Sequence, residues 1–146
     1  MTDRKYAKYF QTDIKLPEGQ HGEAAEYIKD VSRIRMTYLD DSVVQGAFYV
    51  VCTWWTGLSS GESLPPHIHD VDEVLGFYGS DIQNPRNLGG EIEFWLEEEK
   101  YVLDTSFLVF IPKGMKHCPL KLLSIERPIF HVGVMLNGQY SKEEKV

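Results

Sequence analysis

The segment PPHIHDVDE, residues 65–73, carries the strongest structural signal in this chain. Its two histidines, His67 and His69, are two positions apart. On an extended strand such residues point to the same side, whereas on a helix they would diverge by about 200°. Pro65 and Pro66 come directly before them and disfavour a helix that starts here. The segment therefore predicts a strand that presents both imidazoles to one side.

Two further residues extend this pair into a candidate metal site. Glu73 closes the same segment, and His117 lies in a later segment, PKGMKHC, at residues 112–118. Three imidazoles and one carboxylate form a complete ligand set for a divalent transition metal. We therefore expect His67, His69, Glu73 and His117 to bind one metal ion. Nitrogen and oxygen ligands suit Fe, Mn, Ni, Co and Zn, so the pattern does not select among these metals.

The rest of the chain has the rhythm of an all-β protein. From residue 32 onward, segments rich in Val, Ile, Tyr, Phe and Trp alternate with Gly, Pro, Asp and Asn at intervals of roughly 8–12 residues. This spacing favours an antiparallel β-sandwich or β-barrel over alternating strands and helices. The expected strands lie within residues 31–39, 46–55, 73–79, 91–96, 100–104, 107–112, 120–125 and 128–136.

The length of the chain and the positions of its turn-forming residues predict one domain with two flanking segments. The 146 residues are close to the usual size of a single domain. We expect an N-terminal arm at 1–31 with a short helix at 22–30, a β-barrel domain at 32–138 and a frayed tail at 139–146. Residues 80–90 contain Asn84-Pro85 and Gly89-Gly90 and are expected to form the longest loop.

Composition excludes several classes of partner. The net charge is −7 and basic residues form no cluster, which argues against binding to nucleic acid or to an anionic membrane. No apolar run approaches the roughly 20 residues of a transmembrane helix, and the N-terminus lacks the apolar core of a signal peptide. We expect a cytoplasmic protein. The two cysteines do not form a disulfide framework, and Cys118 is expected to be a buried reduced thiol facing away from the metal.

With their flanks, the candidate ligands resemble the two motifs of the cupin superfamily. The first motif is represented by Gly61, His67-x-His69, Glu73 and Gly79, with five residues between the last two where the family form has six. The core of the second is represented by Pro112-x-Gly114-x-x-His117. This motif departs from the family pattern at Ser106, where a glycine is expected, and at Lys121, where asparagine is common. The resemblance covers about residues 61–121.

The resemblance implies a small antiparallel β-barrel of jelly-roll type with a metal inside its wider end. It also implies a small-molecule substrate or ligand and a homodimer, for which Trp54-Trp55 and the aromatic N-terminal arm offer apolar surface. The expected function is a metal-dependent enzyme whose reaction type (dioxygenase, isomerase or lyase) is not resolved. The alternative is a non-catalytic, metal-containing module that binds a small molecule.

Which strand faces line the interior stays open at this stage. In one strand either Glu91, Glu93 and Trp95 or Ile92, Phe94 and Leu96 face inward, and the apolar set is favoured. In another strand the inward face carries either Tyr49, Thr53 and Trp55 or Phe48, Cys52 and Trp54. The roles of two further residues are also undecided. His131 is either a satisfied core histidine or a pocket residue, and Arg86 is either a solvated loop residue or a contact for an anionic substrate.

Overall fold

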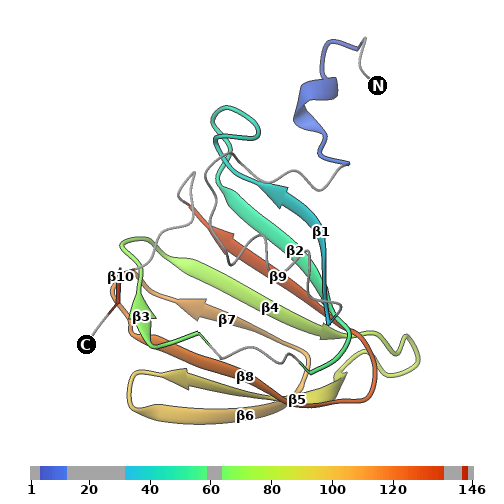
Figure 1. Cartoon of the computed structure of the whole chain (residues 1–146), viewed down its shortest axis with the longest axis vertical. Coiled ribbons are helices and arrows are strands. Elements are labelled where there is room, and N and C mark those ends of the chain that lie inside the picture. Colours follow the sequence, from blue (N-terminus) through green and yellow to red (C-terminus); the bar gives the residue numbers. More distant parts are fainter. Residues whose placement is uncertain (1–3, 13–31, 59–63, 137–142, 145–146) are drawn as a thin grey trace.

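The protein consists of two five-stranded antiparallel sheets in a computed structural model that describes residues 4–12, 32–58, 64–136 and 143–144 (Figure 1). In spatial order, the first sheet contains β1 (Arg33–Leu39), β2 (Tyr49–Trp55), β9 (Ile129–Met135), β4 (Glu73–Gly79) and β7 (Phe107–Ile111). The second contains β10 (Glu143–Glu144), β3 (His67–Ile68), β8 (His117–Ile125), β5 (Asn87–Leu96) and β6 (Glu99–Thr105). The predicted antiparallel all-β fold is confirmed.

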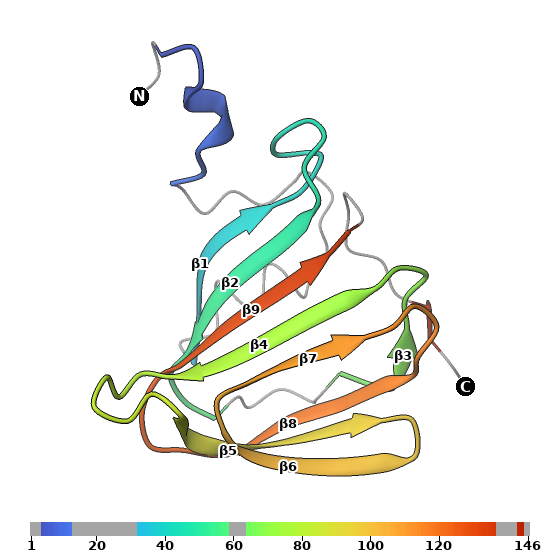
Figure 2. The ribbon, with the colours of Figure 1, turned by 180° about the vertical axis from the view of Figure 1, so that it is seen from behind.

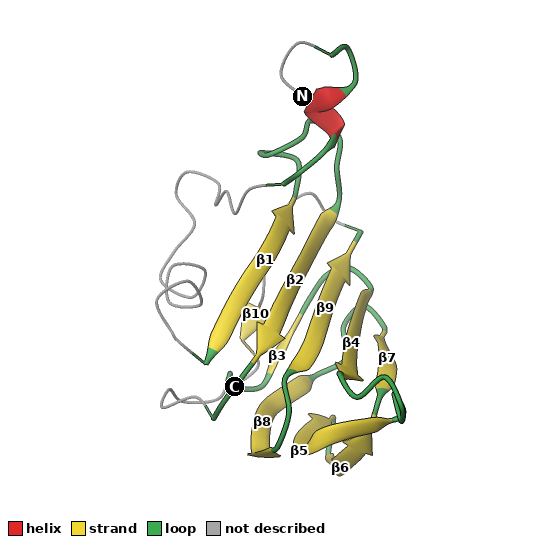
Figure 3. Cartoon of the chain, turned by 90° about the vertical axis from the view of Figure 1, so that its right-hand side faces the viewer, coloured by secondary structure: helices red, strands yellow, loops and turns green. Residues whose placement is uncertain are grey.

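Strands that are neighbours in a sheet are often distant in sequence, which is typical of a jelly roll. For example, β9 lies between β2 and β4, and β8 lies between β3 and β5 (Figure 2). Seen from the side, β3 and β10 lie behind β2 and β9, so that the two sheets enclose an interior (Figure 3). This topology brings β3, β4 and β8 together, although their sequence positions differ by up to about 50 residues.

Helical structure is confined to one short turn in the described part of the chain. This is the 3-10 helix η1 (Ala7–Tyr9). The helix predicted at 22–30 and the motif residue Gly61 lie outside the described residues. Among the described residues, no helix has the length and apolar character needed to cross a bilayer.

The inner face of the first sheet is settled by burial. Along β2 the buried residues are Tyr49, Val51, Thr53 and Trp55, whereas Cys52 and Trp54 are only partly buried and Phe48 is exposed. Of the two alternatives, the set with Tyr49, Thr53 and Trp55 therefore faces inward.

Burial also decides which face of β5 in the second sheet points inward. Ile92 and Phe94 are buried, Glu91 is exposed, and Glu93 accepts a hydrogen bond from the Trp95 indole N–H at 3.3 Å. The favoured apolar face therefore packs inward, and these carboxylates do not form an acid/base pair in the interior. Side chains from both sheets form the main core, which contains Trp55, Phe77, Leu88, Ile92, Phe94, Ile111, Cys118 and Ile129.

Two segments differ from the sequence prediction. Strand β5 begins at Asn87, so the end of the expected 80–90 loop is strand. Gly89 allows this because it adopts φ +75° within a register shift between Asn87 and Ile92. In the tail expected to fray, Glu143 and Glu144 pair with Ile68 and His67. Backbone pairing of this kind requires no apolar side chains, which is why the polar composition did not predict it.

Candidate metal centre

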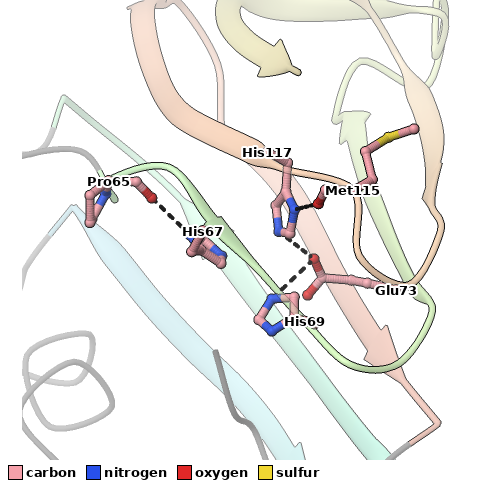
Figure 4. Close-up of polar contacts among 6 residues, drawn as sticks. All are labelled: Pro65, His67, His69, Glu73, Met115 and His117. Atoms are coloured by element: carbon pink, nitrogen blue, oxygen red, sulfur yellow. Dashed lines mark hydrogen bonds and ion pairs between the residues drawn. The ribbon is translucent and has the colours of Figure 1, made fainter. Parts of the chain in front are cut away.

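Three strands deliver the four candidate ligands. His67 is the first residue of β3, Glu73 the first of β4 and His117 the first of β8. His67 is paired in register with His117, and His69 follows β3 directly. Both His67 and His69 are buried while Ile68 between them is only partly buried, so the predicted alternation of the H-x-H segment is confirmed. Figure 4 shows the side chains of His69, Glu73 and His117 pointing toward one another.

The turn before His117 is fastened to the segment that carries the other ligands. Gly114 adopts φ +83°, a conformation that favours glycine, and its N–H donates to the carbonyl of His69 at 2.9 Å. The N–H of Lys113 donates to Asp72 Oδ1 at 2.8 Å, and the N–H of Met115 donates to the Pro112 carbonyl at 3.0 Å. This network fixes the approach of His117 to Glu73.

The Glu73 carboxylate lies between two imidazoles. Its Oε1 is 3.2 Å from Nε2 of His117 and 3.7 Å from Nε2 of His69. The three histidine rings have centroid separations of 4.4 to 5.1 Å. All four side chains are buried, with exposed fractions between 2% and 5%. The cluster is therefore compact and shielded from solvent.

Backbone carbonyls determine the tautomers of two histidines. Nδ1 of His67 lies 2.8 Å from the Pro65 carbonyl, and Nδ1 of His117 lies 3.0 Å from the Met115 carbonyl. A carbonyl oxygen only accepts, so each Nδ1 must donate its proton. In the neutral ring, Nε2 then carries a lone pair that is available to a metal.

The local environment keeps His67 neutral. Its pKa is lowered from 6.5 to about 4, chiefly by burial and to a smaller extent by the neighbouring His117 and His69 rings, while the Pro65 carbonyl and Glu73 oppose the shift. Since a protonated imidazole cannot bind a metal, a low pKa leaves this ring ready to act as a ligand at neutral pH.

The donor set fits a divalent transition metal. Nε2 of His117 is buried, and no described residue donates a hydrogen bond to it. Glu73 Oε1, which lies 3.2 Å from it, is itself an acceptor. Acceptors that converge in a buried site are unfavourable unless a cation lies between them. Imidazole nitrogen and carboxylate oxygen are ligands suited to Fe, Mn, Co, Ni or Zn.

The cluster divides into two sets of three potential ligands. His69, Glu73 and His117 form one set, and His67, His117 and Cys118 form the other; within each set the ligand atoms lie within 4.8 Å of one another. The expectation that Cys118 faces away from the site is therefore wrong. Cys118 adopts φ +76°, and the β5–β8 register shifts between Phe94 and Leu96, which interrupts the alternation of strand β8. No sequence signal identified this bulge.

His131 lies on the inner face of β9 and belongs to neither set of potential metal ligands. Its ring stacks on Phe77 with centroids 4.3 Å apart, and its Nδ1 donates to the Gly76 carbonyl at 3.0 Å. Burial lowers its pKa to about 4. These contacts are those of a satisfied core histidine. Arg86 is exposed in the loop before β5.

Comparison with known proteins gives matches in structure but not in sequence. No protein-family profile and no curated protein sequence match the chain. An oxalate oxidase structure matches with a TM-score of 0.53 at 12% identity, over 98% of this chain and 66% of that one. A protein with a double-stranded β-helix domain from Klebsiella pneumoniae matches with a TM-score of 0.46 at 16% identity, over 90% and 91% of the two chains. The DMSP lyase DddQ from Ruegeria pomeroyi matches with a TM-score of 0.45 at 15% identity, over 90% and 59%.

The oxalate oxidase match agrees with the fold class that the strand order defines. The chain shares the antiparallel jelly-roll fold of that structure, which is the fold that the resemblance of its two motifs to the cupins implied. It spans between 45% and 66% of the length of the oxalate oxidases and DMSP lyases that it matches. At these low identities the similarity establishes the fold, and the function must be argued from the site.

Proposed function

We propose that this protein is a metal-dependent enzyme that acts on a small organic molecule. One divalent transition metal would be bound by His67, His69, Glu73 and His117. The observation that carries the proposal is the convergence of buried acceptor atoms, with Glu73 Oε1 3.2 Å from Nε2 of His117 and 3.7 Å from Nε2 of His69. Within this group, the ligand atoms of His69, Glu73 and His117 lie within 4.8 Å of one another.

The metal would supply a Lewis acid for an oxygen atom of the substrate. The chain's own residues prepare the site: the Pro65 and Met115 carbonyls hold the His67 and His117 rings in the tautomer with Nε2 unprotonated. Four protein ligands would leave up to two positions of a six-coordinate metal open for a substrate, and an open position is the feature that distinguishes catalytic from structural sites. Dioxygenase, isomerase and lyase reactions all use such a centre, so the reaction type stays open.

We expect a small and partly apolar substrate because the interior of the barrel is aromatic. Tyr49 and Trp55 on the inner face of β2 are buried, and Phe77 of β4 packs against Trp55 with ring centroids 5.0 Å apart. An aromatic interior of this kind favours apolar or aromatic groups. The cytoplasmic location expected from the sequence stays a prediction.

A metal and substrate screen tests the proposal. Metal-stripped protein would be loaded separately with Fe(II), Mn(II), Co(II), Ni(II) and Zn(II), and each form assayed with and without oxygen on enolisable and catecholic compounds. We expect turnover with at least one metal and its loss in Glu73→Gln. A protein that binds metal stoichiometrically but turns over none of the compounds would support a non-catalytic binding module instead.

We also propose that the protein is a homodimer that pairs through the outer face of the first sheet. This face is apolar across every strand: cross-strand neighbours join Ile34 to Trp54, Trp54 to Phe130, and Phe130 to Tyr78. The β7 residues Leu108 and Phe110 continue it and are 63% and 58% exposed. The expectation that Trp55 contributes is wrong, because Trp55 is 4% exposed and faces the core.

The size and chemistry of this face favour a second copy as its partner. Five strands of about seven residues give a projected area of roughly 500 Å², which is in the range of about 300–600 Å² of the largest apolar patch on a typical monomer, a patch that is often functional. The face lacks charged residues at its described positions, so a two-fold contact of the patch with itself brings no like charges together.

Light scattering at micromolar concentration tests this assembly. We expect a dimer for the native chain and a monomer for the double variant Leu108→Glu/Phe110→Glu. The matched control is Val102→Glu, which places a charge on an exposed residue of β6 in the other sheet and should stay dimeric. A monomeric native chain, or a dimeric double variant, would contradict the proposed interface.

A further inference from the structure

A second set of potential metal ligands lies beside the carboxylate-containing set and includes a thiol. One ring nitrogen each of His67 and His117 and the sulfur of Cys118 lie within 4.8 Å of one another. The three side chains are buried, with exposed fractions of 2%, 2% and 5%. Two buried histidines and a buried cysteine differ in chemistry from the first set, because a thiolate is a soft ligand.

The backbone shows why two consecutive residues of β8 reach the same interior. On a regular strand, His117 and Cys118 would point to opposite faces. Here the register between β5 and β8 shifts between Phe94 and Leu96, and Cys118 adopts φ +76°. Its side chain joins the interior core that also contains Phe94 and Phe77. The bulge therefore adds a sulfur ligand to a wall that already carries the His117 imidazole.

The spacing is close to that required by a tetrahedral metal. With Zn–S and Zn–N bonds of about 2.3 and 2.0–2.1 Å, ligand atoms lie roughly 3.3–3.6 Å apart. Atoms within 4.8 Å of one another need to approach by at most about 1.5 Å, a movement within the reach of side-chain rotation. The Pro65 carbonyl that orients His67 and the Met115 carbonyl that orients His117 serve this set as well.

We propose that Cys118, with His67 and His117, forms an alternative binding site for zinc or another thiophilic cation. As the metal–sulfur bond forms, the Cys118 thiol proton passes to solvent and the thiolate becomes the ligand. His117 belongs to both sets. Its Nδ1 donates to the Met115 carbonyl, so Nε2 is the ring nitrogen left for a metal, and its lone pair can bind only one ion. Occupation of the two sets is therefore mutually exclusive: Mn(II) and Fe(II) take the set with Glu73, and Zn(II) takes the set with Cys118.

This inference goes beyond the proposed function, because it concerns where zinc binds and does not depend on turnover. X-ray absorption at the zinc edge of the zinc-loaded protein tests it directly. We expect one sulfur scatterer at about 2.3 Å in the native chain and only nitrogen and oxygen in Cys118→Ser. The Cys52→Ser variant is the matched control, since Cys52 lies on the outward side of β2; it should retain the sulfur scatterer.

Competition titrations separate the two ligand sets. Cys118→Ser should weaken zinc binding at least about tenfold and leave Mn(II) affinity unchanged, whereas Glu73→Gln should weaken Mn(II) binding and keep the zinc–sulfur signal. Cys118→Ala, with its fold verified by circular dichroism, provides a second variant if serine is poorly tolerated in the core. A zinc spectrum of the native chain without sulfur would overturn the inference. A zinc–sulfur signal in a protein that fails to bind Mn(II) through Glu73 would support it and contradict the proposed function.

Discussion

Replacing His131 should remove a pH-dependent loss of stability that the fold imposes. The ring stacks on Phe77, lies 5.5 Å from the Trp55 ring and donates to the Gly76 carbonyl. Burial lowers its pKa from 6.5 to about 4, and Arg33 acts in the same direction, while the Gly76 carbonyl and Glu73 oppose them. In the unfolded chain the imidazole regains its ordinary pKa near 6.5.

The sign and size of the effect follow from these two pKa values. Below pH 6.5 the unfolded chain binds a proton that the folded chain does not. The free energy of unfolding therefore decreases as the pH is lowered, until the ring is protonated in the folded state near pH 4. At pH 5 this loss amounts to about 2 kcal/mol, and it reaches about 3 kcal/mol below pH 4. His131→Gln and His131→Phe lack the titrating group and should lose that much less stability on acidification.

Urea denaturation of the metal-free protein at pH 7 and pH 5, followed by tryptophan fluorescence, measures this difference. Between the two pH values the urea midpoint of the native chain should fall by about 1 M more than that of either variant, given an m-value near 2 kcal/mol/M. His67, whose pKa is also about 4, contributes equally to all three proteins and cancels. Equal midpoint shifts in the native chain and both variants would refute the assignment of a low pKa to His131.

Three other substitutions should lower the free energy of unfolding because they disturb packing or hydrogen bonds. Gly79→Ala would place Cβ 1.9 Å from the Asn87 carbonyl oxygen and should lower the free energy of unfolding by at least about 2 kcal/mol, whereas Gly57→Ala, with ordinary contacts, should be nearly neutral. Phe77→Ala in the core should cost about 3–5 kcal/mol by urea denaturation; a loss below 1 kcal/mol would contradict its central position. Ser106→Ala removes the hydroxyl that accepts from the Gly79 N–H and donates to the Pro85 carbonyl, and should cost about 1 kcal/mol; an unchanged midpoint would contradict this role.

Much of the fold could be predicted because the relevant signals are local. Segments rich in β-branched and aromatic residues, separated by turn residues, located the principal strands, and the H-x-H spacing correctly placed His67 and His69 on one side of a strand. Glu73 and His117 were chosen for their chemistry and motif context, and the jelly-roll topology then brought them within 3.2 Å. The departure at Ser106 also has a structural explanation, since its hydroxyl joins β4 to the loop before β5.

The errors arose where strand periodicity is interrupted. Cys118 was expected to point away from the site because side chains alternate along a strand, but a bulge turns it inward. Gly89 similarly lets β5 begin earlier than the turn residues indicated. Such bulges depend on pairing with a partner strand that is distant in sequence, and no local pattern specifies them. The choice between inward Trp55 and outward Trp54 likewise needed the register of the completed sheet.

The central claim is that this β-barrel binds a metal ion at His117 and its neighbours. Metal content after reconstitution and gel filtration tests it most directly, in the native chain, His117→Ala and the control His131→Gln, each verified as folded by circular dichroism. His117 belongs to both ligand sets, so its loss should remove bound metal whichever set is occupied. We predict one metal per chain in the native protein and the control, and less than a tenth of that in His117→Ala, on the order of the loss that follows removal of a ligand. Full metal content in His117→Ala would contradict the account.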